Sequence, residues 1–257
     1  MNSYAETLQH LIFDLRIAIS LCTRLQIGPA LPAGDGDVAR ASWAFPVAGL
    51  VVGLFGAAVY WLASRVHAPP LPASALAMTA TILLTGAMHE DGLADTADGF
   101  GGGKTRENKL EIMRDSRIGT YGACALVVSL MLRWSALAEI ADPRFITIAL
   151  ISAHVSARAA LPIFMSFVPP ARTDGLSTSA GQPPRQSAAI ALMLGAVCLL
   201  FGLGPSGAFV GVLALSSIGL VLARLAIKQI GGQTGDVLGA LEQASEAAIL
   251  LTAASLL

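Results

Sequence analysis

Long apolar stretches set the organisation of the chain. Seven of them reach or approach about 20 residues, the length of helix that crosses a bilayer core of roughly 30 Å. They cover residues 43–63, 71–88, 118–140, 145–167, 187–203, 208–227 and 237–257. Residues 204–207, Gly-Pro-Ser-Gly, have a turn composition that separates the fifth stretch from the sixth. The pattern predicts an all-α, polytopic membrane bundle of about seven transmembrane helices, built as a single membrane-embedded domain over residues 1–257. Glu242 and Glu246 interrupt the last stretch, and whether it crosses completely stays open.

The N-terminal segment has a different pattern. Between residues 6 and 27, apolar positions alternate with Asp14, Arg16 and Arg24 at helical spacing. This predicts an amphipathic helix that lies on the membrane surface or dips into it. It belongs to a cytoplasmic or interfacial segment covering residues 1–42. No basic region or small-residue cleavage site is present here, so no cleavable signal peptide is expected.

Composition agrees with a membrane protein. Hydrophobic residues make up 54% of the 257 residues, charged residues 13%, and mean hydropathy is +0.68. A soluble domain usually has about 25% charged residues, so too few polar side chains exist here to cover a water-exposed surface. The net charge of -1 gives no bulk field that favours nucleic acid. Cys22, Cys124 and Cys198 are far apart in apolar stretches, which favours buried thiols over disulfides or a zinc site.

The basic residues predict the orientation. Twelve fall on one side of the predicted membrane: Arg16, Arg24, Arg40, Lys104, Arg106, Lys109, Arg114, Arg117, Arg172, Arg185, Arg224 and Lys228. The other side receives only Arg65 and Arg144. The positive-inside rule therefore places the N-terminus and the segment 89–117 in the cytoplasm of a bacterium, with the chain in its inner membrane. No internal repeat is evident, so an inverted-repeat transporter gains no support.

An acidic segment follows the second apolar stretch. Glu90, Asp91, Asp95 and Asp98 share one face if the segment is helical, because they are three or four residues apart or adjacent. Such crowded carboxylates repel one another unless a cation lies among them. Oxygen ligands at this density suit a hard ion, Mg²⁺ or alternatively Mn²⁺. A solvated acidic helix end is the simpler interpretation, but it would more often mix its charges.

Two other motifs fail at single positions. His89-Glu90 begins like a zinc-protease motif, but position 93 is Leu instead of His. Residues 103–105 end like a P-loop, yet its first glycine would fall on Asp98. The glycines at 99 and 101–103 would let backbone N–H groups approach phosphate oxygens, or form a flexible linker.

A basic segment comes next. Glu107 and Glu111 are four residues apart, which predicts a short surface helix. Arg114 and Arg117 are suited to clamping phosphate oxygens, and Asp115 to orienting a guanidinium. Membrane-surface attraction is the alternative. Acids, glycines and arginines in this order favour phosphoryl or phosphodiester transfer at a membrane surface, so the segment 89–117 is predicted to be a cytoplasmic catalytic loop.

Polar residues in other stretches add a second wall. Arg158 and His154 lie in the fourth stretch; Arg158 would reach a phosphate or pair with an acid, and His154 would bind or pack. Arg133 is assigned a structural role, either pairing with Glu139 or reaching the surface. Residues 231–236, Gly-Gly-Gln-Thr-Gly-Asp, follow the sixth stretch on the cytoplasmic side, and Asp236 there is a site residue, the N-cap of the last helix, or both.

In these motifs the chain resembles the adenosylcobinamide-GDP ribazoletransferase family, also called the cobalamin 5′-phosphate synthase family. The matching segments are residues 23–25, 45–50, 89–103, 110–122, 156–158 and 232–236. The resemblance covers nearly the whole chain. It implies an Mg²⁺-dependent transferase that joins adenosylcobinamide-GDP to α-ribazole or its 5′-phosphate and releases GMP, late in cobalamin biosynthesis.

The resemblance and the chemistry together assign roles to residues. Metal ligands are expected to be Glu90, Asp91, Asp95 and Asp98, and catalytic residues Asp91, Asp95, Arg114 and Arg117. Substrate-binding residues are expected to be His89, Lys104, Asp115, Arg158, Gly232, Thr234 and Asp236. Either Asp91 or Asp95 could instead be the general base.

Two rival functions are weaker. A CDP-alcohol phosphotransferase also begins with an Asp-x-x-Asp-Gly sequence, found here at 95–99, but Ala-Arg would follow where this chain has residues 100–103, Phe-Gly-Gly-Gly. A cation transporter would distribute its acids along a path across the bilayer, whereas the strongest candidates lie together. The small residues of 49–56 would permit close helix packing, including in a homo-oligomer.

Overall fold

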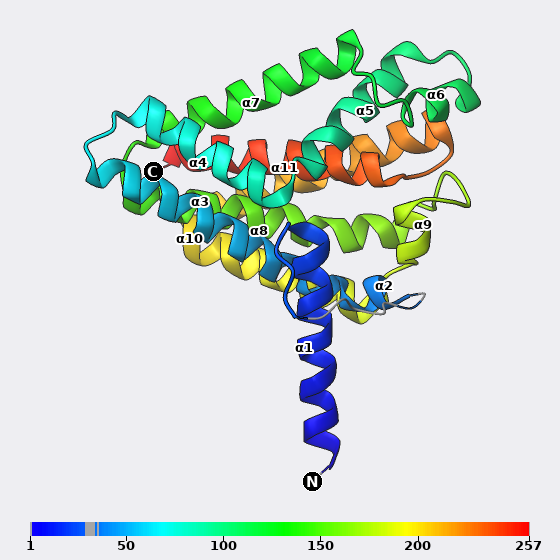
Figure 1. Cartoon of the computed structure of the whole chain (residues 1–257), viewed down its shortest axis with the longest axis horizontal. Helices are drawn as coiled ribbons and strands as arrows, with labels where there is room; N and C mark the ends of the chain where they lie inside the picture. The colour runs from blue at the N-terminus through cyan, green and yellow to red at the C-terminus, as the bar shows by residue number, and fades with distance from the viewer. Residues whose placement is uncertain (1, 29–33, 35, 257) are drawn as a thin grey trace.

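The structure, a computed structural model, describes residues 2–28, 34 and 36–256, and within them it is helical (Figure 1). The long helices are α1 (Asn2–Cys22), α3 (Phe45–Arg65), α4 (Pro70–Thr85), α5 (Met88–Gly102), α7 (Thr120–Ile140), α8 (Pro143–Phe167), α10 (Arg185–Ile230) and α11 (Gly235–Leu256). Short helices are α2 (Asp37–Ala41), η1 (Ser42–Ala44), α6 (Arg106–Ile112) and α9 (Leu176–Ala180). The predicted all-α membrane bundle is confirmed.

Most predicted spans reappear as helices with ends shifted by a few residues. Among the described residues, five helices are long and apolar enough to cross a membrane, and the α4–α5 pair, bent by 87°, is a sixth candidate. The 46-residue α10 contains both the fifth and the sixth predicted stretches. The last predicted span is α11, despite its two glutamates, and residue 257 lies outside the described part of the chain.

Helix α10 turns back on itself at the predicted turn. Gly204 has φ 70° and ψ 178°, outside the helical region and accessible mainly to glycine. A Cβ added to Gly211 would lie 3.3 Å from a methyl carbon of Leu199. Twelve residues of straight helix would separate these positions by about 18 Å. The two arms of α10 are therefore antiparallel neighbours, and each arm corresponds to one of the two predicted spans.

The centre of the bundle is α8, which packs against α3, α10 and α11. Helix α3 approaches α8 closely through small residues. A Cβ on Gly49 of α3 would lie 3.0 Å from the Cα of Val155, and one on Gly53 would lie 2.9 Å from the Cα of Ile151. The small-residue run 49–56 thus serves close packing inside the chain, as glycines do between membrane helices.

A sharp bend joins α4 to α5. Gly86 and Ala87 both have positive φ, 67° and 58°, which ends α4 and redirects the chain. The side chain of Arg24 lies where a Gly86 side chain would be, and the Arg24 backbone N–H donates to the Leu84 carbonyl at 2.7 Å. The bend sets the direction of the helix that carries the acidic segment.

The predicted N-terminal helix is confirmed as α1. In Figure 1 its first half projects from the bundle, and Leu8, Leu11 and Ile12 are exposed there. Its second half packs against α3 and buries Ile17 and Cys22. An exposed apolar half is what a surface-lying helix presents to lipid, and its position on a membrane stays a prediction.

Charged side chains are buried between α5, α7, α8 and α11. Arg133 of α7, only 1% exposed, donates to Glu90 at 3.2 Å and to Glu246 at 3.0 Å. The expected pairing of Arg133 with Glu139, or its extension to the surface, was wrong. Glu139 was the acid nearest in the same apolar stretch, but only the folded bundle brings Glu90 and Glu246 beside the guanidinium.

A second buried arginine completes the group. Arg158 lies 2.6 Å from Glu242, and His154 lies 3.1 Å from Glu246. His89 contacts both Arg158 and Glu242, at 3.4 Å and 3.6 Å. We call the set Glu90, Arg133, Arg158, Glu242 and Glu246, with its two histidines, the buried ion network. It links four helices, and it places Glu242 and Glu246 in the interior of the bundle.

Replacing Arg133 with leucine removes the shared partner of Glu90 and Glu246. Because an uncompensated buried charge costs about 3–5 kcal/mol, we expect R133L to melt about 10 °C below wild type, measured by circular dichroism in detergent micelles. R144L is the control, since Arg144 pairs with Asp142 on the surface and its loss should shift melting by at most about 2 °C. Equal melting temperatures for the two variants would contradict a stabilising network.

Candidate active site

Helix α5 presents its carboxylates in different directions. Asp91 is exposed and Asp95 half-buried, and both line a cavity of about 440 Å³ together with Arg114 and Asp115. Glu90 also lines this cavity, but one of its carboxylate oxygens accepts a hydrogen bond from Arg133. The predicted loop 89–117 is thus mostly helical, in α5 and α6, and it brings five predicted site residues together. We call this space the outer cavity.

Helix α11 adds a carboxylate to the site. It crosses α5 closely at two glycines: a Cβ on Gly92 would lie 3.2 Å from the Cα of Gly239 and 2.9 Å from the Asp236 carbonyl oxygen. The crossing places Asp236 near both Asp91 and Asp95, which feel its charge. Acids from segments about 140 residues apart therefore share one location, as predicted when residues 231–236 were assigned to a second wall.

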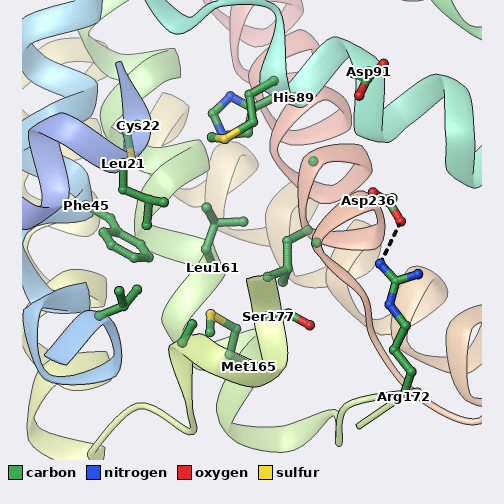
Figure 2. A pocket seen from close by; sticks show the side chains of 16 residues that line it. Leu21, Cys22, Phe45, His89, Asp91, Leu161, Met165, Arg172, Ser177 and Asp236 are labelled. Carbon is green, nitrogen blue, oxygen red and sulfur yellow. Dashed lines mark ion pairs between the residues drawn. The ribbon is translucent and has the colours of Figure 1, made fainter. Parts of the chain in front are cut away.

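A second cavity, of about 200 Å³, meets the first at Asp91 (Figure 2). In this inner cavity Leu21, Phe45, Leu161 and Met165 lie on one side, whereas Asp91, Asp236 and Arg172 lie on the other. A nitrogen of Arg172 lies 3.9 Å from an Asp236 oxygen. The inner cavity thus has an apolar part and a charged part.

The two predicted phosphate arginines differ in position. Arg114 lines the outer cavity, and one of its guanidinium nitrogens donates to both carboxylate oxygens of Asp174, at 2.6 and 2.7 Å. Arg117 is fully outside, with 86% of its side chain exposed, and grips Asp115. Hydrogen bonds from the Arg117 side chain and backbone lower the pKa of Asp115 to about 2. Arg114 is the better placed of the two.

Asp98 is committed to the backbone. Its two oxygens accept N–H bonds from Gly119 and Gly122, at 2.7 and 2.8 Å, where α7 begins. It therefore satisfies free donors at a helix N-terminus. Its assignment to the metal stays a prediction, with less carboxylate capacity left than at Asp91 or Asp95.

The glycines after Asp98 do not form a loop. Gly99, Gly101 and Gly102 are the last turns of α5, and α5 ends before Gly103. Side chains of Met113 and Tyr121 fill the spaces where side chains on Gly99 and Gly101 would be. The expected phosphate loop or flexible linker was wrong, because the glycines permit α6 and α7 to pack against α5.

The residues before α11 have separate roles. Thr234 caps the helix, since its hydroxyl oxygen accepts the Val237 N–H at 3.3 Å and donates to Asp236 at 3.1 Å. The suggestion that Asp236 is the N-cap was therefore wrong. Gly232 is buried against the backbone of residues 169–171, and the Gln233 N–H donates to the Pro169 carbonyl at 2.8 Å. This pairing fixes the entry to α11 beside the site.

Three other predicted residues do not line the outer cavity. Arg158 is 1% exposed and pairs with Glu242, the second of its two expected partners. His89 bridges, because it lines the inner cavity and also contacts the buried ion network. Lys104 is exposed between α5 and α6.

The carboxylate oxygens of Asp91, Asp95 and Asp236 are the donor type that a hard divalent cation takes, although among the described residues only His154, Glu242 and Glu246 bring three ligand atoms within 4.8 Å of one another. Asp95 is surrounded by the charges of Asp91, Asp236 and Asp98, and the structure describes no ion pair for Asp91 or Asp95 among the residues it covers. The buried glutamates, by contrast, each contact an arginine. Unbalanced carboxylate oxygens on an accessible surface are the ligands that Mg²⁺ prefers.

Comparison with known proteins now decides the family. The family model described as Cobalamin-5-phosphate synthase matches residues 14–254. The chain belongs to this family. It is 62% identical over 97% of its length, and 96% of the relative, to adenosylcobinamide-GDP ribazoletransferase of Bradyrhizobium diazoefficiens. Identity is 48% to the enzyme of the same name from Mesorhizobium japonicum, covering 95% and 94% of the two chains. No solved structure matches the chain.

The candidate site includes residues that the sequence pattern did not indicate. Asp174 holds Arg114, and Arg172 contacts Asp236. Arg172 entered the sequence analysis only as a marker of topology. Its position directly after the fourth apolar stretch, on the same side as the acids, is a signal that could have drawn attention to it. Leu161 and Met165 carried no signal beyond hydrophobicity, and Phe45 carried only its place in the matching segment 45–50.

The acids of the candidate site should differ in their effects on stability. D98A would leave the Gly119 and Gly122 N–H groups without acceptors, at about 1–3 kcal/mol, so we expect its melting temperature to fall by several degrees. D95N removes like-charge repulsion, so in chelator it should melt at or above the wild-type temperature. Thermal denaturation in detergent with EDTA compares them, and a greater loss in D95N than in D98A would reverse these assignments.

Proposed function

We propose that the chain joins adenosylcobinamide-GDP to α-ribazole, or to its 5′-phosphate, with release of GMP in the presence of Mg²⁺. Family membership and the relatives' enzyme name support the substrates. The observation that supports the chemistry is the meeting of Asp91, Asp95 and Asp236 without an arginine for each. The active site is proposed to face the cytoplasm of the bacterial inner membrane.

The reaction exchanges one bond to phosphorus for another. A ribose hydroxyl oxygen of α-ribazole attacks the corrin-side phosphorus of the diphosphate, and the bond from that phosphorus to the GMP oxygen breaks. The hydroxyl proton passes to a carboxylate, Asp91 or Asp95, both of which line the outer cavity. Each residue can accept a proton without breaking a described ion pair.

Cations on both sides of the diphosphate would neutralise its charge. Asp91, Asp95 and Asp236, with Glu90 at the cavity edge, would hold the Mg²⁺, with Mn²⁺ as the alternative. When bound, the ion supplies neutralisation of the phosphate oxygens and of the leaving group. Arg114 would bind a phosphate oxygen from the opposite wall, once exchange with substrate releases Asp174.

A rival transport function is disfavoured by the buried acids. Glu242 and Glu246 are the deepest carboxylates, and each lies within 3.0 Å of an arginine nitrogen. A cation crossing the bilayer would have to displace these guanidinium groups. Paired charges of this kind are typical of structural networks.

The activity is tested with purified protein in detergent, adenosylcobinamide-GDP, α-ribazole and Mg²⁺, measuring GMP and the completed cobamide by chromatography. We expect D91N and D95N to lose at least about 100-fold in kcat/KM while remaining folded, and EDTA to abolish turnover. D142N is the matched control, since Asp142 lies in the α7–α8 connection and pairs with Arg144. No product from folded wild-type protein would sink the proposal.

Orientation is tested by labelling single cysteines in a variant without Cys22, Cys124 and Cys198. We expect K104C to resist a membrane-impermeant maleimide on cells whose outer membrane alone is permeabilised, and to react after the inner membrane is opened. V66C, at an exposed site in the α3–α4 connection, should react in both conditions. The reverse pattern would overturn the cytoplasmic site.

A further inference from the structure

The inner cavity lies beside the acids but is not explained by diphosphate chemistry. Its walls include Leu21 of α1, Phe45 of α3, and Leu161 and Met165 of α8, all apolar and on the side away from Asp236 (Figure 2). A phosphate or metal ion has no use for such a surface, because neither gains from contact with hydrocarbon. The surface fits an apolar, preferably aromatic group.

Size decides which part of the substrates can enter. The inner cavity holds about 200 Å³, below the roughly 300–1,000 Å³ of pockets that enclose whole drug-sized ligands. A corrin ring is far larger than such a ligand, and a guanosine carries many polar groups that an apolar wall would leave unpaired. A methyl-substituted benzimidazole is small, flat and mostly apolar.

Connectivity sets the direction in which such a group would bind. Asp91 lines both cavities, and Asp236 with Arg172 forms the charged part of the inner one. A nucleoside whose base occupies the apolar part would hold its ribose near Asp91. That is the position from which a ribose hydroxyl can reach a diphosphate in the outer cavity.

We propose that the inner cavity binds the heteroaromatic base of α-ribazole, with Phe45, Leu161 and Met165 contacting the base and Asp91 and Asp236 facing the ribose. This assignment rests on the proposed function and adds the substrate subsite to it. Cys22 also lines the cavity, and burial raises the pKa of its thiol to about 11. The thiol is therefore neutral at physiological pH, which keeps the apolar part uncharged.

The cavity also gives the N-terminal segment a role in substrate choice. Leu21 of α1 and Val38 of α2 form one part of the wall, and Ser177 and Ala180 of α9 form another. Of these elements, α1 and α9 are outside the candidate membrane spans. They close a space that α3 and α8 alone would leave open, so the size of the accepted base depends on them as well as on the bundle.

The test is base-size selectivity, measured as the ratio of kcat/KM for an α-ribazole analogue with an additional fused ring to kcat/KM for α-ribazole. M165A removes side-chain volume from the wall and should raise this ratio about tenfold, since each methylene in an apolar pocket changes discrimination by roughly 10–200-fold. A180L adds volume and should lower it by a similar factor. KM for adenosylcobinamide-GDP should stay within about twofold in both.

The ratio is taken within one preparation, so a partly misfolded variant does not distort it. M193A is the matched control, because Met193 of α10 is 58% exposed on the outside of the bundle, and its ratio should equal that of wild type. Unchanged ratios in both M165A and A180L would overturn the base assignment. If wild type makes no product at all, the proposed function fails. Calorimetric affinities of the two nucleosides for the same variants then decide the cavity assignment by the same criterion.

Discussion

The pairing of charges inside an apolar bundle is the constraint on which the rest of the structure depends. Two arginines, Arg133 and Arg158, pair with three glutamates in the buried interior of the bundle. Leaving one such charge unpaired would cost several kcal/mol, a large share of the 5–15 kcal/mol that stabilises typical proteins. The helices α5, α7, α8 and α11 must therefore keep one relative position. The acid-bearing helix is held rigidly because its Glu90 belongs to this network.

Adjacent acidic residues of α5 have different roles, because some hold neighbouring helices in place and others face the cavities. A helix rotates about 100° per residue, so Glu90 faces Arg133 while Asp91 faces the open cavities. One turn later Asp95 faces the outer cavity, and Asp98 holds the start of α7. The acids that are paired fix the helix, and those that are not can bind a cation. A rigid helix is also a more precise support for metal ligands than the loop that the glycines suggested.

The sequence predicted most of the fold because hydrophobic length and charge asymmetry are local properties. It could not predict partners, which depend on how helices are arranged. Arg133 had a nearby acid in its own stretch, Glu139, yet the bundle supplied Glu246 from α11. The glycines from 99 onward have the same composition in a loop and at a helix crossing, and only packing against Tyr121 distinguishes the two. Asp236 lies near Asp91 and Asp95, as expected from its predicted place on the same membrane side.

The two cavities resolve a conflict of solubility between the substrates. An apolar base gains from leaving water, whereas a diphosphate and a corrin with polar side groups must stay near it. The inner cavity lies toward α8, between α1 and α11, and the outer one opens beside Arg114. Because Asp91 lines both, a nucleoside in the inner cavity and a diphosphate in the outer one would meet beside that residue. A membrane bundle is suited to this division, since its interior supplies apolar walls and its buried ion network keeps the charged boundary in place.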